Sequence, residues 1–425
     1  MDTHLKKVRI ELFEPRVGFP ISFILLILTG ANSYFPSLGD YEVTTPQWVY
    51  YGLALALYYV GVYVAGYLYK NKKNSQENIN YSRIGGNTSR LAESDAAILT
   101  LTLISISCFG VNYLSTAAKV SFNILNIEEF RVAFVDNSNV LNTLYNLSAK
   151  LVLIFAGMKL MNNLRSGYLT KICFIIAIII LNILLVRGNL FMTLLLLMII
   201  FNYAYKKISL KIILICFVIA VLTFAVIGII RIHAIADSPL LAELGGMDHV
   251  YALYAAHLLD YVQFGPKALA FLMEIIPNQI DYYYGFDTLS PLYNVVSHFL
   301  SDKASEERFL PHFIVMGLLG YEQETGQGVA VGMTTHFYVD AGLPGILIGY
   351  FLVGYILELL YRRMNQKRNN ITIFFYAYFL QAALWGLYAH IFNGISDLLL
   401  PILVYIFLKT SKLKINTEIS LPQPT

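Results

Sequence analysis

Two arginines interrupt long apolar runs, where a charged side chain is costly. Arg187 lies in LLVRGNLF and Arg231 lies in IGIIRIHAIA. A guanidinium stays charged at any relevant pH, and its planar fork of donors can bind two oxygens of one phosphate. Arg131, in EEFRVAF, and Arg308 extend this set. Arginines gathered at a membrane edge are suited to binding a lipid-linked phosphate, although each could equally extend to the lipid headgroups.

One histidine lies in a polar stretch that leads into an apolar run. His336 occurs within TTHFYVDAGLPG, close to Tyr338, Asp340 and Gly342. An imidazole exchanges protons near neutral pH, so at a lipid–water boundary it can take the proton of a hydroxyl group. Asp340, if it turns toward the imidazole, would fix the tautomer of the ring. The alternative is that His336 is a hydrogen-bonded structural residue, as most isolated histidines are.

Other chemistries find little support in the sequence. The eight histidines show no metal-binding spacing such as HExxH, so we predict no metal and no cofactor. The three cysteines lie inside apolar runs, where cysteine usually acts as a small hydrophobic side chain. The formal net charge is only +3 and the basic residues form short clusters. We therefore expect no nucleic-acid partner.

The elements that would position the arginines and the histidine are membrane-spanning helices. Hydrophobic residues make up 57% of the 425 residues and charged residues only 13%, whereas soluble domains carry about 25% charged residues. The runs long enough to cross about 30 Å of hydrocarbon lie near residues 18–36, 48–69, 95–115, 141–162, 169–186, 189–205, 210–230, 342–361, 371–390 and 393–409. We predict an all-α polytopic membrane protein with about ten transmembrane helices, forming one integral membrane domain over residues 1–425.

The basic clusters predict the orientation of these helices. Lys and Arg in short loops resist translocation, and in this chain every second loop is basic. The basic clusters contain Lys6, Lys7, Arg9, Lys70, Lys72, Lys73, Arg165, Lys171, Lys206, Lys207, Lys211, Arg362, Arg363, Lys367, Arg368, Lys409, Lys412 and Lys414. Both termini are then cytoplasmic, and the candidate site residues face the extracytoplasmic side of the membrane.

Two longer segments separate the predicted spans. Residues 70–94 form a polar cytoplasmic loop, and residues 231–341 form the extracytoplasmic segment that is large enough to hold folded structure. The longer segment contains stretches at helical apolar spacing, such as YALYAAHLLDYV, which are broken by prolines. We expect it to form several short helices on the membrane surface or dipping into it.

The chain resembles the bacterial oligosaccharide repeat-unit polymerases (O-antigen and capsule polymerases), which are related to the O-antigen ligases. In architecture the resemblance covers most of the chain, with its many spans, cytoplasmic ends and one large late loop. At the level of sequence motifs the resemblance is short and covers HFYVDAGLPG, from His336 to Gly345. The family's signature begins with His or an acidic residue, continues with an aromatic residue and then Asn or Asp, and ends with GxxG. Arg187 and Arg231 are similar to the arginines that flank the preceding spans in this family. Polymerases often carry Glu in place of His336, and a histidine there is similar to the ligases.

The resemblance implies a membrane-embedded glycosyltransferase (GT-C-like) fold in a bacterial inner membrane, with the site facing the periplasm. The growing chain would move from its undecaprenyl-diphosphate carrier onto the terminal sugar of the next lipid-linked repeat unit, giving O-antigen or capsular polysaccharide. Arginines would stabilise the charge that grows on the departing diphosphate. The implied partners are the lipid-linked oligosaccharide, the bilayer and a chain-length regulator protein. The implied catalytic residues are His336, Arg187 and Arg231, and the implied substrate-binding residues are Arg131, Arg308, Tyr338, Asp340 and Gly342.

Three other functions stay open. An O-antigen ligase would use the same donor and a lipid-core sugar as acceptor, and a membrane acyltransferase would also use His and Arg. A transporter or flippase for lipid-linked sugars typically carries ionisable groups deep in the membrane, whereas the unusual charges here lie at the outer edge.

Lys150 falls within the fourth predicted span. It has either a buried polar partner or, as we expect, a place near the surface because the span begins later.

Overall fold

The computed structural model describes residues 11–31, 45–74, 95–120, 130, 133–134, 139–162, 167–182, 187–205, 207–216, 218–219, 222, 266, 268–285, 287–289, 332–367, 369–387 and 395–418. Within these ranges the regular elements are helices, and no residue lies in a strand. In chain order the helices are α1 (Gly18–Ala31), α2 (Thr45–Asn74), α3 (Asp95–Ala117), α5 (Asn139–Asn162), α6 (Tyr168–Asn182), α7 (Arg187–Ala204), α13 (Met333–Lys367), α14 (Asn370–Gly386) and α15 (Ile395–Glu418).

Four helical stretches are long and apolar enough to cross a membrane: Thr45–Lys70, Asp95–Ala117, Val140–Leu160 and Met333–Lys367. Gly18–Ile27, Tyr168–Asn182 and Phe191–Ala204 are shorter apolar helices. The predicted class, a helical membrane protein, is therefore confirmed. The number of about ten spans remains a prediction, since the seventh apolar run, near 210–230, is described only in part.

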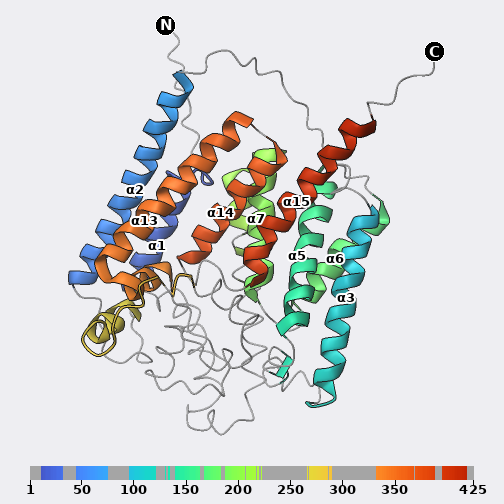
Figure 1. Ribbon diagram of the computed structural model, residues 1–425, viewed down its shortest axis with the longest axis horizontal. Coiled ribbons are helices and arrows are strands. Elements are labelled where there is room, and N and C mark those ends of the chain that lie inside the picture. The colour runs from blue at the N-terminus through green and yellow to red at the C-terminus, as the bar shows by residue number, and fades with distance from the viewer. Residues whose placement is uncertain are drawn as a thin grey trace.

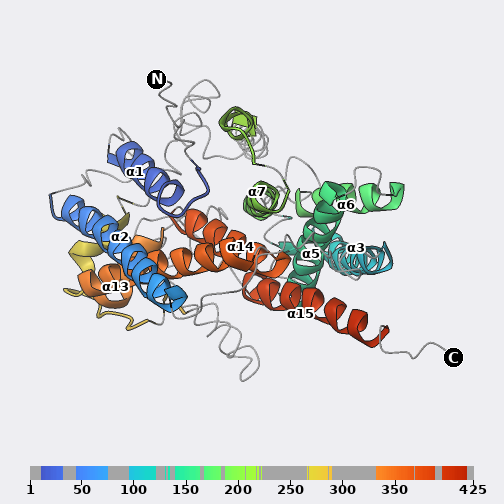
Figure 2. The same cartoon turned by 90° about the horizontal axis from the view of Figure 1, so that it is seen from above.

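The helices form two lateral groups with a third group between them (Figures 1 and 2). On one side α2 packs against α13, with α1 beside them, and on the other side α3, α5 and α6 contact one another. Between these groups α14 contacts both α13 and α7, and α15 contacts α5. Helix α14 therefore links α13 to α7 and the rest of the bundle.

The surface of α3 shows how lipid replaces water as the solvent of this fold. Large apolar side chains such as Leu103 and Leu114 are exposed, whereas the buried face of the helix carries Thr102, Ser105 and Asn112. Small polar residues let helices approach closely, and their hydrogen bonds to main-chain oxygens satisfy them inside the protein. The Ser105 hydroxyl, for example, donates to the carbonyl oxygen of Tyr145 in α5 at 3.2 Å.

Ion pairs gather at one end of the bundle, the upper end in Figure 1. Arg16 lies 2.6 Å from the carboxylate of Glu358 in the last third of α13, and the residue pair Lys207 and Glu11 is also in contact there. At the same end Lys159 of α5 lies 2.7 Å from Asp95 at the start of α3. This clustering agrees with the basic loops of the sequence, and the assignment of this end to the cytoplasm remains a prediction.

A further ion pair lies inside the bundle. Lys150 Nζ of α5 lies 2.7 Å from Asp397 Oδ1 of α15. The two residues are only 2% and 5% exposed. Our expectation that Lys150 lies near the surface was therefore wrong, because the helix begins at Asn139 and places Lys150 in its middle. The alternative, a buried partner, is what the structure shows.

Helix α13 consists of two segments that meet at a sharp kink. Gly342 has φ 63° and ψ −144°, a conformation that favours glycine, and Pro344 has no N–H to continue the helix. The first segment folds back on the second, because the hydroxyl oxygens of Thr334 and Tyr350 lie 2.5 Å apart. A Cβ at Gly345 would lie 2.0 Å from the carbonyl oxygen of Phe337. The predicted span at 342–361 therefore begins at the kink, and the helix extends back to Met333.

Candidate functional site

A buried carboxylate–imidazole pair lies at the beginning of α13, at the end of the bundle opposite the ion pairs. The Nδ1 atom of His336 lies 2.5 Å from Oδ2 of Asp287. Both side chains are buried, with His336 at 4% and Asp287 at 0% relative exposure. The pair joins α13 to residues 268–285 and 287–289, which we call the docking segment. This segment, yellow in Figure 1, lies below the start of α13.

The kink in α13 creates the surface on which the docking segment is held. In an unbroken helix the carbonyl oxygens of Val339 and Asp340 would accept hydrogen bonds from the residues four positions later. Here Val339 O accepts from the backbone N–H of Tyr283 at 3.0 Å, and Asp340 O accepts from that of Tyr284 at 2.8 Å. The glycine and the proline of the kink thus release two main-chain acceptors for a second segment of the chain.

The side chain of Asp340 adds three hydrogen bonds to this attachment. Its carboxylate accepts the backbone N–H groups of Gly285, Asp287 and Thr288 at 2.9–3.0 Å. Three N–H donors around one carboxylate fix the turn that carries Asp287. The condition under which Asp340 would fix the tautomer of His336 is not met, since the carboxylate of Asp340 binds the docking segment. Asp287 is the carboxylate that pairs with His336, and Asp340 positions it.

Burial and charge affect the acidity of Asp287 in opposite directions. Burial raises the pKa of Asp287 above its ordinary value of 3.8, the imidazole of His336 lowers it, and the nearby charge of Asp340 raises it again. The net direction is upward. A carboxylate bonded to Nδ1 favours the neutral tautomer with its proton on that atom, so that Nε2 is the basic nitrogen. The pair can therefore accept and return a proton.

Two of the residues predicted to bind substrate, Tyr338 and Gly342, make contacts within the protein, and their substrate contacts remain a prediction. The Tyr338 hydroxyl donates to the carbonyl oxygen of Ile276 at 2.9 Å, which attaches the first half of the docking segment to α13. At Gly342 a Cβ would lie 2.7 Å from the hydroxyl oxygen of Tyr282. Gly342 thus provides both the positive φ of the kink and the space for a docking-segment side chain.

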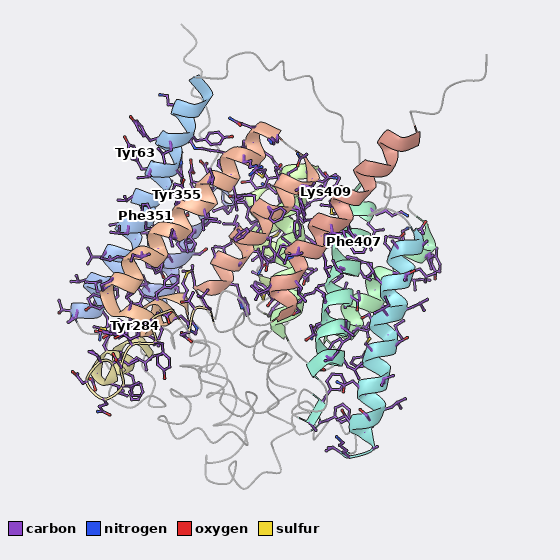
Figure 3. All side chains as sticks on the ribbon, in the orientation of Figure 1. Tyr63, Tyr284, Phe351, Tyr355, Phe407 and Lys409 are labelled. Carbon is purple, nitrogen blue, oxygen red and sulfur yellow. The ribbon has the colours of Figure 1, made fainter. Side chains whose placement is uncertain are left out.

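Aromatic side chains surround the outer part of this site. The ring of Tyr338 lies between those of Tyr50 and Tyr282, with centroid distances of 6.2 and 6.3 Å. Tyr284 is 71% exposed and has φ 52°, an uncommon value for a residue with a side chain. Figure 3 shows Tyr284 at the lower end of the bundle, away from Lys409 on α15. The docking segment thus presents an exposed aromatic ring close to the buried pair.

The expected arginine cluster lies largely outside the described residues. Arg131, Arg231 and Arg308 fall outside them, and for Arg187 the structure describes only the backbone, as the first residue of α7. Helix α7 begins at the end of the bundle where α13 begins (Figure 1). Most of the predicted loop 231–341 and of the predicted loop 70–94 also lies outside the described residues.

Sequence reasoning did not identify Asp287 as a site residue. It ends the sequence YYYGFD, two residues after Gly285, and an aspartate close to a glycine is common in turns. Pairing His336 with a distant acid requires the docking of two segments 49 residues apart in sequence.

Fold and site together define an all-helical membrane protein with a buried carboxylate–imidazole pair at one end of its bundle. No family model matches the chain, and no curated protein or solved structure is significantly similar to it. Among the residues that the structure describes, no three His, Cys, Asp or Glu side chains are grouped as the ligands of a metal ion would be.

Proposed function

We propose that this protein is a membrane glycosyltransferase that polymerises undecaprenyl-diphosphate-linked oligosaccharide repeat units at the extracytoplasmic membrane face. The observation that carries the proposal is the 2.5 Å contact between His336 Nδ1 and Asp287 Oδ2. An imidazole oriented by a carboxylate is suited to general base catalysis on a hydroxyl group. The residues from His336 to Gly345 are also those that resemble the polymerase signature.

In the proposed reaction the acceptor hydroxyl oxygen attacks the anomeric carbon of the donor sugar. The bond from that carbon to the diphosphate oxygen breaks, and its electron pair leaves with the diphosphate. The hydroxyl proton passes to Nε2 of His336. Asp287 keeps the ring in the required tautomer and stabilises the imidazolium that forms.

The departing diphosphate requires positive charge close to this base. We propose that Arg187 and Arg231 bind it, with Arg131 and Arg308 contributing to the substrate site. The start of α7 at Arg187 lies at the same end of the bundle as His336 (Figure 1), which supports this placement. Guanidinium groups that already point at the developing charge lower the barrier because they need little reorganisation.

Transport of lipid-linked sugars is a second candidate function, and one observation favours it. Lys150 and Asp397 form a buried ion pair at 2.7 Å, and buried ionisable groups in membrane helices often mark ion or substrate pathways. An O-antigen ligase would use the same base and donor as the polymerase. The product distinguishes the three functions: long polymer on the carrier, polymer on the lipid core, or unpolymerised repeat units on the other membrane face.

The test is the substitution His336→Ala in cells that lack the native protein. Removing a general base typically lowers the rate by about 10²–10⁴-fold, so we expect loss of long polysaccharide at normal membrane protein level. His336→Glu should restore part of the polymer, because a carboxylate can also accept the proton. Chain length on a gel, normalised to membrane protein level, is the measurement.

Asn278→Ala is the matched control, because Asn278 lies in the docking segment and, among the described residues, its side chain bonds locally, to Glu274 O at 3.2 Å. It should leave chain length unchanged. Normal polymer from well-expressed His336→Ala protein would exclude the proposed role of His336.

A further inference from the structure

Three consecutive tyrosines of the docking segment differ in what surrounds them. Tyr282 and Tyr283 are partly buried and pack against the hydrophobic core, whereas Tyr284 is 71% exposed. Tyr63 on α2 is similarly exposed, at 74%, and it lies on a helix long enough to span the membrane. Figure 3 shows Tyr63 on the upper part of α2 and Tyr284 at the lower end of the bundle. Tyr63 is therefore a reference for a tyrosine whose neighbour is lipid.

The backbone of Tyr284 differs from that of Tyr63. Tyr284 has φ 52° and is followed by Gly285 with φ 95°, so two consecutive residues have a positive φ. Among the described residues other than glycine, Tyr284 is the one with a positive φ. Glycine, asparagine and aspartate dominate such turn positions, because a larger side chain is disfavoured there. Disfavoured backbone conformations cluster at ligand-binding and catalytic sites.

The Tyr284 residue is held at two points. Its backbone N–H donates to the carbonyl oxygen of Asp340 at 2.8 Å, and its hydroxyl donates to Oδ1 of Asp281 at 3.2 Å, a bond that an amide oxygen could also accept. Because the hydroxyl is engaged, the ring offers a ligand its face and not its polar tip. A ring that is already fixed loses little conformational freedom when a ligand binds to it.

The same residue of α13 holds the ring and the acid of the buried pair. The main-chain oxygen of Asp340 accepts the N–H of Tyr284, and the carboxylate of Asp340 accepts the N–H of Asp287, which contacts His336. Tyr284 precedes Asp287 by three positions. The Cα atoms of these two residues are therefore at most about 11 Å apart, a span that an oligosaccharide can bridge.

The chemistry of the ring face favours a sugar. One face of a pyranose ring is lined by C–H bonds, whose hydrogens carry a small positive charge, and the π-face of a tyrosine is negative. Tyrosine provides a large contact area at low entropic cost, because its side chain has few rotatable bonds. The hydroxyl groups at the rim of the sugar stay in water, so stacking of this kind does not require a deep pocket.

We propose that the ring face of Tyr284 binds a pyranose ring of the acceptor oligosaccharide and so holds the acceptor close to His336. This inference rests on the proposed function, because it names a substrate contact of the same site. The competing role is that of Tyr63, in which the ring lies against lipid.

Substitutions at position 284 separate the ring from the backbone. Asparagine tolerates a positive φ better than tyrosine, so Tyr284→Asn should leave the protein level at least as high as that of the native protein. It should raise the apparent KM for the acceptor by about 3- to 10-fold, the effect expected for the loss of one stacking contact, and should retain kcat. Tyr284→Phe keeps the ring face and should retain the native KM. The assay uses the full-length protein in nanodiscs and lipid-linked oligosaccharide extracted from cells that lack the protein. A native KM in Tyr284→Asn would overturn the proposal.

Tryptophan fluorescence tests binding without turnover. Tyr284→Trp is combined with His336→Ala, and Tyr63→Trp in the same background is the matched control. The spectrum of the His336→Ala protein gives the contribution of the two native tryptophans. The probe is the oligosaccharide released from the same lipid extract by mild acid, and lipids with brominated acyl chains act as the quencher. The oligosaccharide should shift the emission of the Tyr284→Trp protein and leave that of the Tyr63→Trp protein unchanged, whereas brominated lipid should quench the latter more strongly.

The two proposals fail in different measurements. Equal quenching of both tryptophan variants by brominated lipid, with no response to the oligosaccharide, would assign the ring of Tyr284 to the membrane surface. Normal polymer from the His336→Ala protein would instead contradict the proposed reaction, and the emission of the Tyr284→Trp protein would still decide whether the ring binds the sugar.

Discussion

Two carboxylates are completely buried at opposite ends of α13, and they are held by different kinds of side chain. Glu358 accepts hydrogen bonds from Arg16 and from Arg362, each at 2.6 Å. Asp287 lies against the beginning of α13, where it pairs with the imidazole of His336. Each carboxylate has a relative exposure of 0%. The difference between the two sites is therefore in the partner and not in the degree of burial.

The partner determines what each carboxylate can do. A guanidinium does not lose its proton in proteins, and the hydrogen bond to Glu358 raises the pKa of Arg16 further. The Glu358 cluster is thus a permanent charge that joins residues 11–17 to α13. An imidazole can lose its proton, and burial raises the pKa of Asp287. Of these two sites, the Asp287 site is the one that combines burial with two groups that can exchange a proton.

Neutral isosteres at the two sites should affect different properties, activity at the Asp287 site and protein abundance at the Glu358 site. Asp287→Asn removes the acid but keeps the shape, so we expect polymer formation to fall by about 10²–10⁴-fold at normal protein level. Glu358→Gln leaves two arginines without their counter-charge. A loss of about 1–2 kcal/mol in stability lowers abundance severalfold, while activity per molecule should be retained. Polymer length and immunoblot of the same membranes measure both effects.

Asp281→Asn is the control for Asp287→Asn, because Asp281 is an exposed aspartate in the same docking segment. It should keep near-native activity. The comparison between the two carboxylates fails if Asp287→Asn is fully active, or if Glu358→Gln inactivates a normally abundant protein.

The attachment of the docking segment should depend on Asp340. Asp340→Ala removes the acceptor of three backbone N–H groups, and unsatisfied buried donors cost about 1–3 kcal/mol each. Because two of these bonds are only partly buried, we expect local opening to become easier by about 3 kcal/mol in total. Hydrogen exchange of residues 283–288 should then be faster by about 100-fold.

Asp340→Asn should have a smaller effect on hydrogen exchange, since one amide oxygen can still accept the N–H groups of Gly285 and Asp287. Unchanged protection of residues 283–288 in Asp340→Ala would show that the docking segment is held by other contacts.

The kink should require glycine at position 342. Gly342→Ala places a Cβ on a residue with φ 63° and ψ −144°, a region that is nearly restricted to glycine, and this costs about 1–3 kcal/mol. The Cβ would also lie 2.7 Å from the hydroxyl oxygen of Tyr282. We expect a lower thermal midpoint in detergent and partial loss of activity. Adding Tyr282→Phe should recover only the part of the loss caused by the close contact. Gly52→Ala is the control, because a Cβ there meets no atom within 4 Å.

The smallest expected effect is a pH dependence of docking. Burial raises the pKa of Asp287, and a carboxyl whose pKa is higher in the docked state binds its proton more tightly there. The protonated carboxyl stabilises the docked state fully below pH 3.8, the ordinary pKa of an aspartate. This stabilisation is lost as the pH rises through the raised pKa of Asp287. Proteolysis of the docking segment should therefore be slower at mildly acidic pH than at neutral pH. The difference should vanish in Asp287→Asn, and a difference that persists there would assign the effect to another group.

Apolar runs were sufficient to predict the helical membrane class and most of the described helices. The run at 48–69, for example, corresponds to α2, and the run at 95–115 corresponds to α3. These predictions succeed because hydrocarbon offers no hydrogen-bond partners, so the backbone N–H and C=O groups of each spanning segment must bond within the protein. A long apolar run that spans the membrane is therefore helical. The same reasoning placed His336 next to a helix start.

Side-chain partners could not be predicted in the same way. The partner of His336 is Asp287 and not the nearer Asp340, because the fold-back at Gly342 turns Asp340 toward the docking segment. The partner of Lys150 is 247 residues away in sequence. Both pairs depend on the packing of segments that are distant in sequence. Hydrophobic periodicity predicts local secondary structure and gives no information on such packing.

The attachment of the docking segment has a consequence for how this protein can diversify. Tyr283, Tyr284, Gly285, Asp287 and Thr288 each donate a backbone N–H to Val339 or Asp340, and a backbone N–H is present whatever side chain the residue carries. Exposed positions such as Tyr284 are therefore free to mutate without loss of attachment. Single mutations can therefore change the rings at this surface while Asp287 and His336 beneath them stay unchanged.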